Sequence, residues 1–108
     1  MVEDKQVWHD TAVGVVAAIR RAAKQKGYAI AWHGSLVKDI DLLAAPWTEN
    51  AAEPQDMVNW VCESVGLWRN PDHKEQNPMQ KPHGRQAWAL HVLGTPVWVD
   101  FSVMPLLK

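Results

Sequence analysis

Apolar and polar residues follow one another with the period of an α-helix along residues 7–26. The apolar positions fall on one stripe: Trp8, Ala12, Val15, Val16, Ile19, Ala22 and Ala23. Basic residues crowd the last turns, where positive charge interacts favourably with the helix dipole, and Gly27 follows as a typical helix stop. The pattern predicts a helix over residues 7–26, preceded by a short polar lead over residues 1–6.

Four further segments have the apolar content and the flanking turn residues of β-strands: residues 28–33, 38–45, 86–93 and 97–104. Gly34-Ser35 separates the first two, and Pro46 ends the second because proline cannot donate to a sheet ladder. Gly94-Thr95-Pro96 predicts a hairpin turn between the last two. The last segment alternates strictly, which predicts one buried face made of Val97, Val99, Phe101 and Val103.

A second helix is expected from near Pro54 to Gly66, with an apolar side made of Met57, Val58, Trp60, Val61 and Val65. Cys62 falls within it as a small buried residue. Residues 68–84 are rich in proline and asparagine and predict a long irregular loop, which is often functional in so short a chain. The order α-β-β-α-β-β indicates an α+β fold, with a four-stranded mixed or antiparallel sheet and both helices packed on one face.

Length and composition limit the classes of function. A chain of 108 residues is expected to form one domain, residues 1–108. The net charge of -1 argues against a general nucleic-acid coat but leaves room for a local basic patch. The single cysteine rules out an internal disulfide and fits a reducing compartment. The polar N-terminal residues do not resemble a signal peptide, and no apolar run approaches membrane-spanning length, so we expect a cytoplasmic protein without a membrane partner.

Three aspartates form the candidate site. Asp39 and Asp41 are expected about 7 Å apart on one face of the predicted strand 38–45. Asp100 stands between two hydrophobic residues on the polar face of the last strand. If these two strands are neighbours, the three carboxylates converge on one sheet face, where they repel one another unless a cation is bound. Oxygen ligands favour a divalent cation such as Mg²⁺. The alternative is a wet strand face that merely tolerates aspartate.

This series of motifs resembles the nucleotidyltransferase superfamily, which has the polymerase-beta-like fold. The family signature is a hydrophobic strand ending in Gly-Ser, an acid–hydrophobic–acid triplet on the next strand, and a third acid on a later strand. The matching residues follow in the same order here: Gly34-Ser35, Asp39-Ile40-Asp41 and Val99-Asp100-Phe101. The resemblance covers nearly the whole chain, as in the small single-domain members of the superfamily.

The resemblance implies a transfer of a nucleoside monophosphate from an NTP to a hydroxyl acceptor, which the sequence does not identify. It implies that Gly34 and Ser35 hold the triphosphate and that Asp39 and Asp41 bind Mg²⁺ or Mn²⁺. It also implies that Asp100 completes the metal site and helps to activate the acceptor hydroxyl for attack on the α-phosphate, with release of pyrophosphate.

Three residues outside the motif are candidate nucleotide contacts. Lys81 and Arg85 in the long loop can neutralise a triphosphate or a nucleic-acid backbone, although loop cations also serve solubility. Trp98 shares the predicted acidic face and is a candidate platform for a nucleobase. In the preceding strand, Trp88 is expected in the core, whereas the alternation of the strand puts His91 beside the acidic face.

One spacing departs from the family pattern, because only Leu36-Val37-Lys38 separates Gly34-Ser35 from the first acid, where the family has a longer segment. Two further interpretations therefore stay open. The chain can be a catalytically degenerate module that binds a nucleotide, nucleic acid or a host protein. It can also be a structural protein that self-associates through a sheet edge or its tryptophans. The small, tryptophan-rich sequence is similar to phage and prophage proteins, which implies a bacterial or phage-infected cytoplasm.

Overall fold

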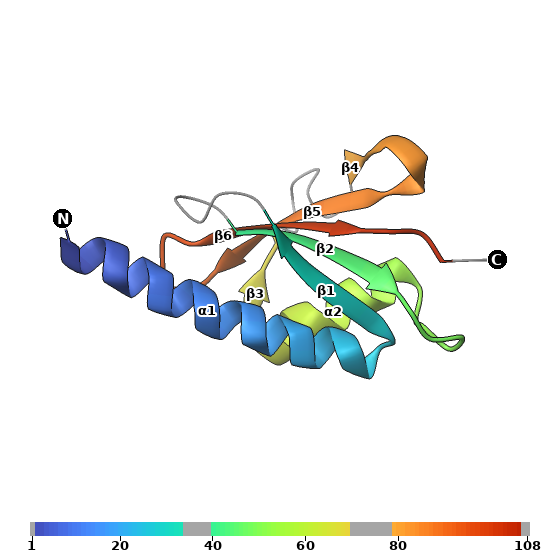
Figure 1. The fold of residues 1–108 in the computed structure, drawn as a ribbon, viewed down its shortest axis with the longest axis horizontal. Coiled ribbons are helices and arrows are strands. Elements are labelled where there is room, and N and C mark those ends of the chain that lie inside the picture. The colour runs from blue at the N-terminus through green and yellow to red at the C-terminus, as the bar shows by residue number, and fades with distance from the viewer. Residues whose placement is uncertain (1, 34–39, 70–78, 107–108) are drawn as a thin grey trace.

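The computed structural model describes residues 2–33, 40–69 and 79–106. Within these ranges two helices lie on the same side of a mixed sheet (Figure 1). The helices are α1 (Val2–Gln25) and α2 (Pro54–Val65), and a short 3-10 turn, η2, spans Pro82–Gly84. The strands are β1 (Tyr28–His33), β2 (Ile40–Pro46), β3 (Leu67–Trp68), β4 (Met79–Gln80), β5 (Gln86–Val92) and β6 (Trp98–Val103). The predicted α+β class, the two helices on one face and the mixed sheet are confirmed.

The order of strands across the sheet is β1-β2-β6-β5-β3. β2 and β6 run parallel, and the other neighbouring strands run antiparallel. β4 also pairs with β5, and because β6 occupies the other edge of β5, β3 and β4 share its outer edge. The predicted number of four strands is wrong. β3 and β4 have two residues each, which is too short for any alternation of apolar and polar residues to indicate a strand.

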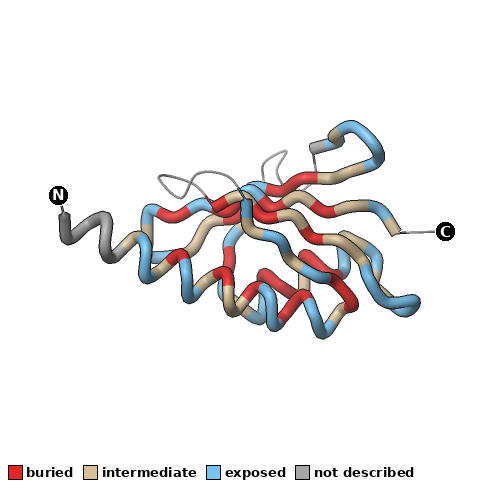
Figure 2. The backbone as a smooth tube through the Cα atoms, in the orientation of Figure 1, coloured by how far each residue is buried: buried red, intermediate tan, exposed pale blue. Residues whose placement is uncertain are grey.

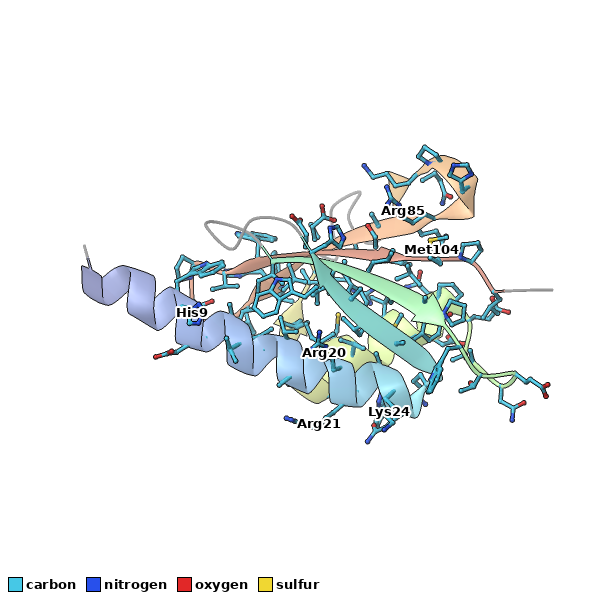
Figure 3. The ribbon with its side chains drawn as sticks, in the orientation of Figure 1. His9, Arg20, Arg21, Lys24, Arg85 and Met104 are labelled. Carbon is cyan, nitrogen blue, oxygen red and sulfur yellow. The ribbon has the colours of Figure 1, made fainter. Side chains whose placement is uncertain are left out.

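α1 begins at Val2, so the predicted polar lead over residues 1–6 is wrong. Those residues carry no apolar stripe, but glutamate, lysine and glutamine are good helix formers and extend the helix that the stripe predicts. The stripe itself is confirmed, since Ala12, Val16, Ile19 and Ala23 are buried. Arg21 and Lys24 point away from the sheet on the opposite side of the helix (Figure 3).

The core lies between the sheet and the two helices, as the buried segments in Figure 2 show. Alternate residues of the three central strands face the helices: Ile40, Leu42, Ala44, Trp88, Leu90, Val99, Phe101 and Val103. α2 adds Met57, Val58 and Val61. Cys62 is also buried, as predicted, and burial raises the pKa of its thiol. Because side chains alternate between the two faces along β5 and β6, the residues between these buried positions face the opposite side of the sheet.

The junction between α1 and β1 is held against the loop that follows β2. The backbone N–H of Trp47 donates to Gly27 O at 3.0 Å, and that of Ala52 donates to Lys26 O at 2.9 Å. The buried Tyr28 hydroxyl donates to Ala52 O at 2.7 Å. Burial, with a smaller contribution from the nearby Glu53 carboxylate, raises the pKa of Tyr28 to about 12. These bonds fix the end of β1 that lies farthest from the candidate site.

Candidate functional site on the outer sheet face

The sheet face opposite α1 and α2, called here the outer face, carries two of the three predicted acidic residues, Asp41 and Asp100. Asp41 of β2 and Asp100 of β6 are register partners on adjacent parallel strands. His33 of β1 is the partner of Asp41 on the other side, and Ala89 of β5 is the partner of Asp100. Side chains of register partners share a sheet face, so His33, Asp41, Asp100 and Ala89 form one row across four strands. The condition on which the carboxylates were expected to converge, that the last strand lies beside the strand of Asp41, is therefore met for Asp41 and Asp100.

The two aspartates differ in their exposure to solvent. Asp41 is half-buried and Asp100 is exposed. The strands that carry them lie about 4.8 Å apart, as neighbouring strands do in any sheet. Two carboxylates are therefore held side by side by backbone pairing alone. A cation near them would lower the free energy of this arrangement.

Three of the predicted site residues fall outside the described residues. They are Gly34 and Ser35, predicted to hold a triphosphate, and Asp39, predicted as a metal ligand. Among the residues that the structure describes, no group of three His, Cys, Asp or Glu side chains is arranged to hold a metal ion. Of the three predicted aspartates, the structure therefore describes two, the register partners Asp41 and Asp100.

A second row on the outer face is aromatic. Trp68 of β3 is the register partner of His91 of β5, and His91 is the partner of Trp98 of β6. The His91 and Trp98 rings are stacked, with centroids 4.7 Å apart and planes inclined by 29°. His91 Nε2 lies 2.8 Å from Thr95 O. Because a carbonyl oxygen only accepts hydrogen bonds, Nε2 carries the hydrogen, and this bond fixes the ring against which Trp98 stacks.

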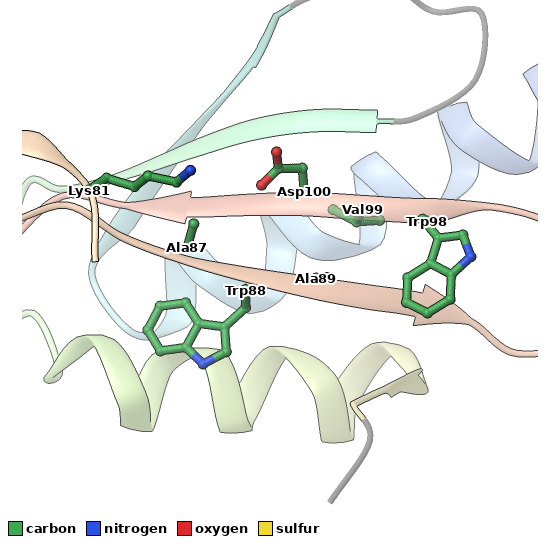
Figure 4. Close-up of a pocket in the computed structure, with 7 residues that line it drawn as sticks. All are labelled: Lys81, Ala87, Trp88, Ala89, Trp98, Val99 and Asp100. Carbon is green, nitrogen blue, oxygen red and sulfur yellow. The ribbon is translucent and has the colours of Figure 1, made fainter. Parts of the chain in front are cut away.

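A pocket of about 330 Å³ joins the two rows. Its lining includes Trp98 and Asp100 of β6, Ala87 and Ala89 of β5, and Lys81 (Figure 4). The Lys81 side chain extends toward Asp100 from one end, and Trp98 stands at the other end (Figure 4). The small side chains of Ala87 and Ala89 leave open space on the pocket floor between Lys81 and Trp98. The pocket thus offers an aromatic surface, a carboxylate and an ammonium group within one small space, as small-molecule sites commonly do.

The hairpin between β4 and β5 positions the two predicted basic residues differently. The Lys81 backbone N–H donates to Arg85 O at 2.8 Å and closes the hairpin. Lys81 lines the pocket, but Arg85 is not among the residues that line it. Arg85 directly precedes Gln86, the register partner of Val103 in β6, and its buried Nε has no hydrogen-bond partner within the described part of the chain. Of these two candidate nucleotide contacts, only Lys81 therefore lies at the pocket.

Several residues of this face were not predicted as a site. Ala87 and Ala89 supply the pocket floor, His91 supports Trp98, and Trp68 extends the aromatic row. Alternation along residues 86–93 does put both alanines and His91 on one face. No pattern in the sequence predicts that Trp68 pairs with His91, because a two-residue strand has no signature. Trp88 is buried as predicted, and its indole N–H has no partner among the described residues.

Comparison with models of protein families, with curated proteins and with solved structures found no match to this chain. None of the described helices has the length and apolar character required to cross a membrane.

Proposed function

We propose that this chain is a metal-dependent nucleotidyltransferase that moves a nucleoside monophosphate from an NTP to a hydroxyl acceptor. One observation carries the proposal: Asp41 and Asp100, far apart in sequence, are register partners on adjacent parallel strands of the outer face. The order of motifs along the chain, with Gly34-Ser35 and Asp39 preceding this pair, agrees with it. The proposed fold assignment is correspondingly nucleotidyltransferase-like.

The donor set fits a divalent cation. Carboxylate oxygens are the ligands that Mg²⁺ and Mn²⁺ prefer, and the pair is accessible enough for phosphate oxygens to approach. Asp41 and Asp100 would hold the ion, with Asp39 as the third ligand. Bound there, the cation would neutralise phosphate charge and polarise the reacting phosphoryl group.

The residues of the chain have separate tasks in this proposal. Gly34 and Ser35 hold the triphosphate, and Lys81 neutralises phosphate charge from the pocket side. Asp100 accepts the proton of the acceptor hydroxyl as its oxygen attacks the α-phosphorus. The bond from the α-phosphorus to the bridging oxygen breaks, and pyrophosphate leaves. Trp98 positions the base.

The variant Asp41→Asn tests the proposal, because it keeps the shape of the side chain and removes its charge. We expect it to lose Mg²⁺-dependent binding of NTP while retaining a folded circular-dichroism spectrum. Asp56→Asn is the matched control, since Asp56 is an exposed carboxylate in the first turn of α2, an element that packs against the opposite face of the sheet. Calorimetric titration with ATP and GTP, with and without Mg²⁺, measures both variants. Unchanged Mg²⁺-dependent binding in Asp41→Asn would refute the metal role.

A second candidate function is nucleotide binding without transfer. The pocket favours it, because Trp98 and Lys81 can hold a base and a phosphate without any contribution from a metal. In that case Asp41→Asn keeps nucleotide affinity, whereas Trp98→Ala loses it. The two functions differ in whether the wild type transfers label from α-labelled NTP to a component of a cell extract. Such transfer, if it is absent in Asp41→Asn, would show that the chain is the enzyme and not a binding module.

A further inference from the structure

The two edges of the sheet differ in length and protection. Among the described strands, β1 forms one edge with six residues, whereas β3 and β4 at the opposite edge have two each (Figure 1). Soluble proteins protect long edge strands with charged residues, proline or bulges, because unpaired backbone groups pair readily with another strand. The segment Tyr28–His33 contains no proline, lysine, arginine, aspartate or glutamate, and its register with β2 runs without a bulge. β1 is therefore a long edge without these protections.

Two hydrogen bonds show which backbone groups of β1 face β2. The Met104 N–H donates to Ala44 O at 2.9 Å, so Ala44 directs its backbone groups toward β6. Ala44 and its antiparallel partner Ile30 are then a pair without ladder bonds between them. The Trp47 N–H donates to Gly27 O at 3.0 Å, which fits the same alternation. Odd-numbered residues of β1 therefore bond to β2, and even-numbered residues direct their N–H and C=O to the open edge.

The open part of this edge is centred on Ile30 and Trp32. Tyr28 also has the outward phase, but it is only 1% exposed and is closed to a partner. Within the described residues, no hydrogen bond reaches the outward N–H and C=O groups of Ile30 and Trp32. Both side chains are half-buried and pack against the core from its margin. The edge thus presents four unpaired backbone groups beside an apolar row that is only partly covered.

A second copy of the strand is complementary to these groups. Antiparallel pairing about a two-fold axis at Ala31 puts Ile30 of each copy opposite Trp32 of the other, and four backbone hydrogen bonds form. Register partners share a sheet face, so these half-buried side chains cover each other on the helix side. On the outer face, the exposed Ala31 meets its own copy, and its small side chain allows the backbones to approach.

We infer that this chain forms a two-fold symmetric dimer in which β1 pairs with β1 of a second copy into one continuous sheet. No lysine, arginine, aspartate or glutamate of the strand opposes a like charge in this pairing. The contact uses the same surface on both copies and leaves only two-residue strands at the outer edges, so assembly ends at the dimer. The pocket lies on β5 and β6, and the dimer leaves it open.

Sedimentation equilibrium and amide hydrogen exchange test the inference on the wild type. One pair of short strands buries less surface than a stable interface does, so we expect a weak dimer. The weight-average mass should rise from 12.2 kDa toward twice that value between about 10 μM and about 1 mM protein. Over the same range the amides of Ile30 and Trp32 should become protected. The amides of Ala29 and Ala31 bond to β2 and should be protected throughout.

Variants at the axis test the register. Ala31→Lys and Ala31→Glu each put like charges directly opposite one another and should each weaken dimerisation about tenfold or more. An equimolar mixture of the two variants should dimerise again, because a lysine then faces a glutamate. Ala29→Lys mixed with Ala29→Glu is the matched control. Ala29 is exposed on the same strand face but lies opposite His33, so this mixture should gain nothing over its components.

Three results would overturn the inference. The first is the mass of a single chain at every concentration. The second is protection of the Ile30 and Trp32 amides in the monomer, which would show that the chain covers its own edge. The third is a dimer in which these two amides stay unprotected, which would put the interface elsewhere. The wild-type measurements stand even if a variant fails to fold. They contain neither metal nor nucleotide, so they and the test on Asp41→Asn fail independently.

Discussion

Replacement of Gly27 by alanine measures how closely the end of α1 packs against the loop after β2. Gly27 has φ +86°, a backbone conformation that residues with a side chain rarely adopt. A Cβ at this position would lie 2.7 Å from Ala51 Cα and 3.0 Å from Ala51 Cβ, and it would overlap Thr48 Oγ1. The backbone of Ala51 cannot withdraw easily, because the neighbouring Ala52 N–H is bonded to Lys26 O.

The expected loss has two parts. The left-handed conformation costs about 1–2 kcal/mol for a residue with a Cβ. Overpacking against Ala51 and Thr48 adds about 1–3 kcal/mol. The sum of about 2–5 kcal/mol is a large share of the roughly 5–15 kcal/mol that stabilises a typical domain. We expect Gly27→Ala to lower Tm by roughly 10 °C or more.

Two other glycines are internal controls for this measurement. Gly66 ends α2 with φ +85°, but a Cβ there would meet no atom within 4 Å, so Gly66→Ala should lose only the backbone part, about 1–2 kcal/mol. Gly14 lies inside α1, also with open space, and Gly14→Ala should gain up to about 1 kcal/mol. Urea unfolding followed by tryptophan fluorescence gives all three values. A loss in Gly27→Ala no larger than that in Gly66→Ala would refute the close packing.

Three further predictions concern single side chains. Tyr28 has a pKa of about 12 in the folded protein against 10.0 in the unfolded chain, so between these values the unfolded chain loses the proton that the folded protein keeps. The stability that is present below pH 10 should therefore fall as the pH rises toward 12. Tyrosinate absorbance reports on this one tyrosine, and Tyr28→Phe should remove the pH dependence. The buried Cys62 thiol, with its raised pKa, should react with iodoacetamide much more slowly in the folded than in the unfolded protein; equal rates would show an accessible thiol. The Thr95 hydroxyl donates to Val92 O at 2.8 Å and accepts from the backbone N–H of Val97 at 3.0 Å. Thr95→Val should therefore lower the free energy of unfolding, measured in urea, by about 1–2 kcal/mol, whereas Thr95→Ser keeps the hydroxyl and should not.

Local patterns in the sequence were sufficient to predict the regular elements that bury one face. The stripe along residues 7–26 predicts the buried side of α1, and the alternation of residues 97–104 predicts that Phe101 is buried and Asp100 is not. Both patterns reflect a periodicity that a helix or strand imposes on its own residues, independent of its neighbours. Pro54 and Gly66 likewise bound α2 as predicted, because their backbone preferences act locally.

Only the tertiary structure decided which residues meet across the sheet. Asp41 and Asp100 come together because β2 pairs with β6 in parallel, a pairing between segments nearly sixty residues apart that no local pattern encodes. The pairing of Trp68 with His91 depends on β3, which is too short to have a pattern of its own. The sequence by itself therefore determined which side chains are polar, aromatic or buried, and the register of non-local strands determined which of them share one site.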